Sequence, residues 1–211
     1  MENTYDLVSS NEDVQKYLFG DNADPEARDR ILRQFGTILD SRSDILNLGI
    51  IAENGRMLIN NGQRLTNQDL DIHSQEWYTN ALEGRESVYL TSSHVQHIIS
   101  GERPWVITLS RGIRNKEMGT GQEKEGVFFI DLNYNAISEL CDQSMVGNQG
   151  YAFIVDADGN IVYHPQQQQL YNELQTENID LVMNAGSDIV TWGDGINKKM
   201  YSISRSEKTG W

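Results

Sequence analysis

The sequence contains a single cysteine, Cys141, among its 211 residues. One cysteine cannot form an intramolecular disulfide or a cysteine-rich metal site, so neither can stabilise the fold. Basic residues are also scarce, with 17 lysines and arginines against 31 aspartates and glutamates. The resulting net charge of −14 argues against nucleic acid and against anionic lipid as binding partners.

Long apolar runs are absent as well. No stretch reaches the roughly 18 apolar residues that a membrane-spanning helix needs, and the polar start MENT is unlike a signal peptide. We therefore expect a soluble protein or a soluble part of a longer one. The end at Trp211, directly after a strand-like run, favours the second expectation.

Two short stretches share one pattern, in which an apolar strand, a glycine corner and a second apolar strand follow each other. Residues 48–62 turn at Asn54-Gly55, and residues 152–165 turn at Asp158-Gly159. Glycine tolerates the positive φ that tight hairpin turns require, so both stretches are predicted to be β-hairpins. Their wide separation along the chain suits two small α+β modules in tandem.

Residues 11–40 predict an amphipathic helix that is interrupted at 20–25, where Asp24 can cap the second part and Pro25 can begin it. Its apolar stripe can pack on the protein's own sheet or form a dimer seam, and the sequence leaves both open. Further strands are predicted at 88–91, 94–99, 105–113, 126–131, 189–192 and 199–204, and further helices at 75–82, 132–141 and 166–184. Hairpins without parallel crossovers indicate an α+β fold with antiparallel sheets.

No group of residues predicts catalysis. Cys141 has no nearby histidine, no serine lies in a nucleophile-elbow context, and no glycine-rich phosphate loop is present. His94 and His97 are spaced as metal ligands on a helix would be, but their segment alternates like a strand, which places them on opposite faces. Residues 156–160 resemble a calcium loop only superficially, because the glycine stands at the fourth position. We therefore expect no enzyme activity, no metal and no cofactor.

Aromatic and acidic residues point instead to binding. Trp77 and Tyr78 lie on the predicted helix at 75–82, and Tyr89 lies on the next strand. Asp131 ends an apolar strand, where it could cap the following helix, although Asn133 could serve equally well. Core packing would explain each aromatic residue alone. Together the group can form an apolar box with one carboxylate, which would accept hydrogen bonds from an ammonium group or from sugar hydroxyls.

The chain resembles a double Cache domain over nearly its whole length, in the segments AENG, EWYTNALEG, VYLTSS, GVFFIDLNYNAISEL and GYAFIVDADGNIVYHP. Members of this family are extracytoplasmic sensors with two PAS-like modules. The chain is most similar to the sensor region of membrane histidine kinases of Gram-positive bacteria. The resemblance implies a long N-terminal helical segment at 1–44, a membrane-distal, ligand-binding module at 45–147, and a truncated membrane-proximal module at 148–211.

The resemblance also implies which residues line the pocket. Members that bind amino acids carry an arginine two residues before the Trp-Tyr pair, a tyrosine and an aspartate on the next strand, and an aspartate at the end of the GVxxxD strand. The corresponding residues here are Gln75, Trp77, Tyr78, Tyr89, Thr91 and Asp131.

Two of these positions depart from the amino-acid-binding pattern, because Gln75 replaces the arginine and Thr91 replaces the second-strand aspartate. Without the arginine, the pocket lacks the bidentate partner of an α-carboxylate. Arg64 and Arg111 are candidate substitutes. The expected ligand therefore shifts from amino acids toward sugars and amines.

The resemblance implies a non-catalytic, extracellular sensor of a small polar molecule, which can be a sugar, an amine or an amino-acid-like compound. The whole protein would be held in the cell membrane by segments outside this chain and would form a homodimer through the N-terminal helix. A histidine kinase is the first expectation for its output. Two alternatives stay open, namely the sensor domain of a chemoreceptor and a protein-interaction domain that docks a ligand-loaded binding protein.

Overall fold

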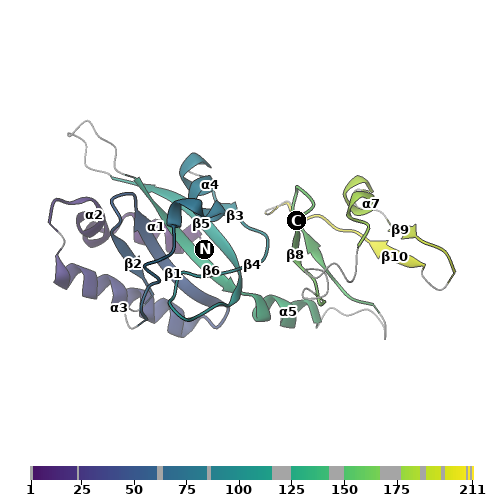
Figure 1. Ribbon diagram of the computed structural model, residues 1–211, viewed down its shortest axis with the longest axis horizontal. Coiled ribbons are helices and arrows are strands. Elements are labelled where there is room, and N and C mark those ends of the chain that lie inside the picture. The colour runs from purple at the N-terminus through teal and green to yellow at the C-terminus, as the bar shows by residue number, and fades with distance from the viewer. Residues whose placement is uncertain are drawn as a thin grey trace. The chain divides into compact units, whose positions relative to one another are not determined.

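The computed structural model describes residues 2–22, 24–60, 64–84, 87–115, 125–142, 150–166, 177–185, 189–195, 198–207, 209 and 211. The chain divides into two compact units, Met1–Ala136 (unit 1) and Ile137–Trp211 (unit 2). Each unit combines helices with antiparallel strands, which confirms the predicted α+β fold (Figure 1). The predicted module boundary at 147/148 lies outside the described residues. None of the described helices is long and apolar enough to cross a bilayer.

Unit 1 is built on one antiparallel sheet of six strands. The strands are β1 (Ile45–Ala52), β2 (Met57–Ile59), β3 (Tyr89–Leu90), β4 (His94–Val95), β5 (Trp105–Arg114) and β6 (Glu125–Asn133). They run in the order β2-β1-β6-β5-β3, and β4 also pairs with β5. The helices are α1 (Glu2–Ser9), α2 (Glu12–Phe19), α3 (Pro25–Ser41), the 3-10 helix η1 (Ile72–Ser74), α4 (Glu76–Gly84) and the start of α5 (Tyr134–Asp142).

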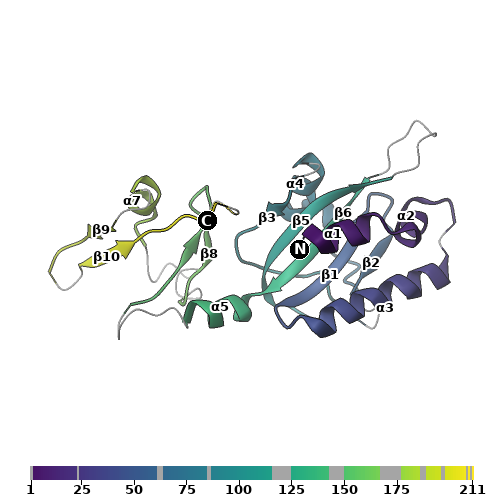
Figure 2. The same ribbon diagram turned by 180° about the vertical axis from the view of Figure 1, so that it is seen from behind.

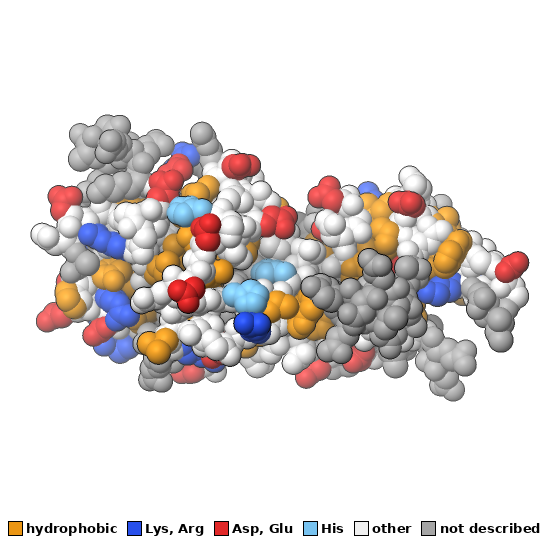
Figure 3. Space-filling model, viewed as in Figure 1, with side chains coloured by type: hydrophobic (Ala, Val, Ile, Leu, Met, Phe, Trp, Pro, Cys, Tyr) orange, Lys and Arg blue, Asp and Glu red, His pale blue; other side chains and the backbone are white. Residues whose placement is uncertain are grey.

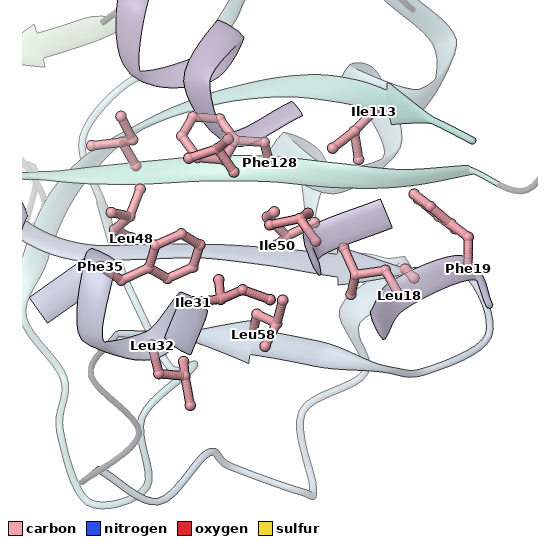
Figure 4. Close-up of a cluster of buried hydrophobic side chains, with 14 of the residues drawn as sticks. Leu18, Phe19, Ile31, Leu32, Phe35, Leu48, Ile50, Leu58, Ile113 and Phe128 are labelled. Carbon is pink, nitrogen blue, oxygen red and sulfur yellow. The ribbon is translucent and has the colours of Figure 1, made fainter. Parts of the chain in front are cut away.

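The N-terminal helices cover one face of this sheet (Figure 2). Asn11 caps α2, and Asp24 caps α3 with Pro25 as its first residue, so the predicted break between the two helices is confirmed. The apolar stripe of these helices packs on the protein's own sheet (Figure 4). Its labelled members are Leu18, Phe19, Ile31, Leu32 and Phe35, which contact a cluster that includes Leu48, Ile50, Leu58, Ile113 and Phe128. Helix α1, which precedes the amphipathic pattern at 11–40 and lies in the helical segment expected at 1–44, adds Val8 to this cluster.

The turn of the first hairpin, which connects β1 and β2, also holds the C-terminal end of α2. Gly55 in the turn has a φ of 83°, the left-handed conformation that the Asn-Gly sequence predicts. The Arg56 guanidinium donates hydrogen bonds of 3.0, 2.5 and 3.1 Å to the carbonyl oxygens of Tyr17, Gly20 and Asp21. The last carbonyl groups of a helix lack intrahelical hydrogen-bond donors, and the helix dipole favours a cation at this end. The Arg56 guanidinium supplies both the donors and the positive charge.

Replacement of Arg56 by methionine should therefore lower the free energy of unfolding of unit 1 by about 1–2 kcal/mol, since three charge-assisted hydrogen bonds are lost at a partly exposed site. Chemical denaturation monitored by hydrogen exchange of the α2 amides would measure this loss. The matched control is Arg28→Met, which breaks only an exposed ion pair with Asp29 and should cost less than about 0.5 kcal/mol. Equal losses in the two variants would contradict the role given to Arg56.

The opposite face of the sheet carries a second apolar cluster beneath α4. Its buried members are Ile51, Ile59, Trp77, Tyr78, Ala81, Ile98, Ile99, Val127 and Phe129. The Trp77 and Phe129 ring centroids lie 4.8 Å apart. Phe129 also packs against Gly49 of β1, where a Cβ atom would lie 2.7 Å from the phenyl ring and 2.8 Å from the Leu58 carbonyl oxygen. Only glycine fits this crowded point of the strand.

Unit 2 contains a second hairpin and a further pair of strands. Its elements are the rest of α5, β7 (Ile154–Val155), β8 (Ile161–Tyr163), α7 (Ile179–Asn184), β9 (Ile189–Trp192) and β10 (Lys199–Ser202). Strand β7 pairs with β8, and β9 pairs with β10, both antiparallel. The Asp156 carboxylate accepts the backbone N–H groups of Asp158 and Asn160, which closes the predicted hairpin turn. Within the described residues, no group of three metal-ligating side chains occurs.

Two predictions about elements were wrong in detail. The helix at 132–141 was expected to turn Ile137, Leu140 and Cys141 inward, but no residue of α5 is buried and Leu140 is 66% exposed. The strand predicted at 94–99 ends at Val95. Gln96 N still donates to Pro104 O at 2.9 Å, but Ile98 and Ser100 form backbone hydrogen bonds with Asn67 and Leu65. Residues 167–176 of the predicted helices at 166–184 lie outside the described residues.

Candidate ligand-binding site

Asp131 is the centre of a buried polar network on the α4 side of the sheet. Strand β6 places it directly opposite Asn47 of β1 and Thr108 of β5. A β-bulge between Ile45 and Asn47 changes the alternation of β1. Ile45 and Leu48 both face the N-terminal helices as a result, and Asn47 faces Asp131.

Three side chains donate hydrogen bonds to the Asp131 carboxylate. Oδ1 accepts from Thr108 Oγ1 at 2.6 Å and from Gln96 Nε2 at 3.1 Å. Oδ2 accepts from Asn47 Nδ2 at 2.8 Å. Asn47 is fixed in turn by Asn60, whose Nδ2 donates to Asn47 Oδ1 at 3.0 Å. All five side chains are buried, so the network is closed to solvent.

Thr91 and His94 extend the network toward the edge of the sheet. The Thr91 hydroxyl accepts the backbone N–H of Thr108 at 2.9 Å. The His94 ring bridges the two threonines, with Nδ1 3.3 Å from Thr91 Oγ1 and Nε2 3.3 Å from Thr108 Oγ1. A polar layer therefore runs from β1 through β6 and β5 to the β3–β4 edge.

The electrostatics of Asp131 set this network apart from ordinary core packing. Removal of the carboxylate from water raises the pKa of Asp131. The hydrogen bonds from Thr108, Asn47 and Gln96 and the charge interaction with His94 oppose only part of that shift. Among the described residues, no lysine or arginine forms an ion pair with it. When ionised, Asp131 is thus a buried negative charge that a cation would stabilise strongly.

The structure connects two of the predicted site residues, Asp131 and Thr91, through Thr108. Trp77 and Tyr78 lie on the same side of the sheet, but they are 1% and 0% exposed and belong to the second apolar cluster. Burial raises the pKa of Tyr78 to about 12. The Trp77 Nε1 and Tyr78 hydroxyl groups have no hydrogen-bond partner among the described residues. A direct contact of either residue with a ligand stays a prediction.

The remaining two predicted site residues lie around the N-terminal end of α4. The half-buried Gln75 donates from Nε2 to Ser74 Oγ at 3.1 Å. The half-buried Tyr89 donates its hydroxyl to Glu76 Oε1 at 2.5 Å. The structure does not bring Gln75 into the Asp131 network.

Neither candidate arginine replaces the missing carboxylate anchor. The Arg111 guanidinium lies 4.1 Å from the centre of the Tyr5 ring of α1, on the sheet face opposite Asp131. Arg64 forms a surface ion pair with Glu102, with 3.3 Å between nitrogen and oxygen. Figure 3 shows acidic side chains spread over the described part of one face, with basic side chains scattered between them.

Sequence reasoning missed most of the network, namely Asn47, Asn60, His94, Gln96 and Thr108. Asn47 and Thr108 each interrupt an apolar run, which is the one signal that the sequence offered. The structure also shows a cavity of about 900 Å³ in unit 2, lined in part by Tyr151, Phe153 and Tyr201, and its lining includes no residue of the Asp131 network. The network itself is filled by protein side chains, so a ligand must displace one of them to reach Asp131.

Comparison with known proteins gave matches along the whole chain. The family model described as the Cache domain matches residues 2–211. Methyl-accepting chemotaxis protein McpC of Bacillus subtilis is 27% identical over 144 residues, which make up 68% of this chain and 20% of that protein. The chain thus spans about a fifth of the length of this curated relative.

Solved structures of similar fold include two ligand-binding domains. One is that of the Campylobacter jejuni chemoreceptor Tlp3 in complex with L-valine, with a TM-score of 0.62, 16% identity, and coverage of 94% of this chain and 75% of that chain. The other is that of the Pseudomonas aeruginosa amino acid chemoreceptor PctC in complex with GABA, with a TM-score of 0.53, 20% identity, and coverage of 79% of this chain and 68% of that chain. At these identities the likeness shows a shared fold.

Proposed function

Because this chain belongs to the Cache domain family, we propose that it is the extracellular ligand-sensing part of a membrane chemoreceptor and has no catalysis of its own. The curated relatives support this output, since they are methyl-accepting chemotaxis proteins. They do not support the histidine kinase that the sequence led us to expect first. In this proposal the membrane segments and the signalling domain belong to parts of the protein outside this chain.

We further propose that the ligand is a small molecule with an ammonium group, and that this group binds Asp131. The observation that carries this proposal is a buried carboxylate that accepts hydrogen bonds but has no lysine or arginine partner among the described residues. An ammonium group supplies both the missing positive charge and N–H donors. Gln75 stands where amino-acid-binding members carry an arginine, so the amine does not need an α-carboxylate.

A partner-docking role has one supporting observation, the closure of the Asp131 network, because a docking domain needs no open pocket. That role gives no reason for a buried carboxylate that has no lysine or arginine partner among the described residues, since its desolvation costs stability. A neutral sugar as the ligand explains the buried Asp131 carboxylate no better, since hydroxyl groups bring no positive charge.

Isothermal titration of the purified chain with GABA, ethanolamine, L-valine and glucose tests the proposal. We expect at least one of the three compounds that carry an ammonium group (GABA, ethanolamine and L-valine) to bind. Asp131→Asn should weaken that binding at least about tenfold, since a charge-assisted contact of about 1.5–3 kcal/mol is lost. The matched control is Asp29→Asn on the exposed side of α3, which should leave the affinity unchanged. Binding of glucose alone, or amine binding that survives Asp131→Asn, would overturn the proposed ligand class.

A further inference from the structure

We propose that Gln96 is a built-in competitor of the ligand, whose carboxamide occupies the place on Asp131 that a ligand ammonium group takes. This inference rests on the proposed function of Asp131. Gln96 Nε2 donates to Asp131 Oδ1 at 3.1 Å, and the two residues are only 1% and 0% exposed. Binding of an amine at this oxygen is therefore an exchange, in which one N–H···O hydrogen bond breaks and another forms.

Gln96 is the most easily displaced of the three donors to Asp131. Thr108 and Asn47 lie on β5 and β1, which pair with neighbouring strands on both sides. Gln96 follows the two-residue strand β4 at the edge of the sheet, where its backbone N–H donates to Pro104 O at 2.9 Å. Its hydrogen bond is also the longest, at 3.1 Å against 2.6 and 2.8 Å for the other two.

The segment that carries Gln96 is a strap, residues 96–100, tied to residues 65–67 by backbone hydrogen bonds. Asn67 N donates to Ile98 O at 2.9 Å, and Ser100 N donates to Leu65 O at 2.9 Å. Gln96 Oε1 accepts the backbone N–H of His97 at 3.1 Å, so the carboxamide is satisfied at both ends. The strap therefore holds Gln96 on Asp131 at a high local concentration, and a free ligand has to compete with it.

The chemistry of this exchange favours one class of ligand. A neutral hydroxyl or amide would replace the Gln96 N–H with an equivalent hydrogen bond and would gain little. An ammonium group adds a charge–charge attraction that glutamine cannot supply, and this attraction is strong at a site without water. Gln96 thus selects against neutral ligands at the same time as it lowers the affinity for amines.

Isothermal titration of Gln96 variants of the chain with GABA and ethanolamine tests the inference, and butyrate serves as the analogue of GABA without the amine. Gln96→Ala, or the nearly isosteric Gln96→Met if the alanine variant does not fold, should bind the amines about tenfold more tightly, since the competing hydrogen bond is absent. Gln96→Lys, which places a tethered ammonium group near Asp131, should abolish amine binding. The matched control is Gln34→Ala on the exposed side of α3, which should change neither affinity.

Two comparisons separate competition by Gln96 from a merely structural role. If Gln96 competes with the ligand, the tenfold gain in affinity should be absent for butyrate and should vanish in the Asp131→Asn background. A gain that persists in either case would overturn the inference, because it would reflect a loosened fold. If Asp131→Asn weakens amine binding but Gln96→Ala does not strengthen it, the inference fails and the proposed function stands. Amine binding only after removal of Gln96 would support the inference and the proposed function. No amine binding to any variant would overturn the inference and the proposed function.

Discussion

Replacement of Glu177 by leucine should unfold most of unit 2, with a loss of about 3–5 kcal/mol in its free energy of unfolding. The Glu177 side chain is 0% exposed and pairs with Lys199 Nζ at 2.9 and 3.0 Å. The Tyr151 and Tyr201 hydroxyls donate to the same carboxylate at 2.5 and 2.8 Å. Leucine would leave these donors without an acceptor, and Lys199, which is 37% exposed, would lose its counter-ion.

His164 completes this cluster as a neutral side chain. The backbone N–H of Gln166 donates to His164 Nδ1 at 3.0 Å, so the single ring proton sits on Nε2, 3.4 Å from Glu177 Oε1. Burial lowers the pKa of His164 and outweighs the attraction of Glu177, which agrees with this tautomer. Lys199, and not His164, therefore supplies the positive charge that Glu177 needs.

The effect of Glu177→Leu should depend on pH. Burial by itself would raise the pKa of Glu177, but the hydrogen bonds from Tyr151, Lys199 and Tyr201 outweigh it and hold the pKa below the usual 4.5. A carboxylate with a lowered folded-state pKa stabilises the fold above its unfolded-state pKa and loses that contribution as pH falls. The difference in free energy of unfolding between wild type and variant should thus be largest near pH 7 and should decrease below about pH 4.5.

Hydrogen exchange resolved by segment would measure this effect, since it reports on the two units separately. In Glu177→Leu the amides of β8 and β10 should lose protection, whereas those of β5 and β6 in unit 1 should keep theirs. The matched control is Glu207→Leu, which changes an exposed glutamate of unit 2 and should leave protection nearly unchanged. Full protection of β10 in Glu177→Leu would show that the cluster does not hold unit 2 together.

Trp77→Ala should destabilise unit 1 by about 3–5 kcal/mol, because it removes one of the largest fully buried side chains of the chain. The indole packs against Phe129 and Tyr78, with ring centroids 4.8 and 6.0 Å away. Its Nε1 donates no hydrogen bond to a described residue, so the loss comes from packing. The void left beneath α4 is lined by strands of the sheet, which cannot collapse into it.

Chemical denaturation and ligand titration together separate the packing role of Trp77 from the predicted ligand contact. Trp77→Phe should keep most of the stability, whereas Trp192→Ala, at a residue that is 39% exposed in unit 2, should cost little. If Trp77→Phe is as stable as the wild type but binds an amine more weakly, the predicted ligand contact gains support. A loss below about 1 kcal/mol in Trp77→Ala would contradict the core role.

Local features of the fold followed from the sequence because they depend on neighbouring residues. Asp24 and Pro25 predicted the start of α3, and Gly55 and Gly159 predicted the two hairpin turns, since capping and positive φ are local requirements. The five sequence segments, in their order along the chain, also predicted the double Cache family, and the match of the Cache domain model over residues 2–211 confirms this. The inward face expected for α5 was wrong, because a helix that joins two units need not bury the stripe that its pattern suggests.

The candidate site was only partly predictable. The sequence by itself determined that Asp131 is an unusual charge at the end of an apolar strand. Only the tertiary structure decided its partners, because strand register and the bulge in β1 place Asn47 and Thr108 directly opposite it. Gln96 comes from an edge segment that no periodicity assigns to the site. Contacts across a sheet join residues far apart in the chain, and their pairing is fixed by packing rather than by local propensity.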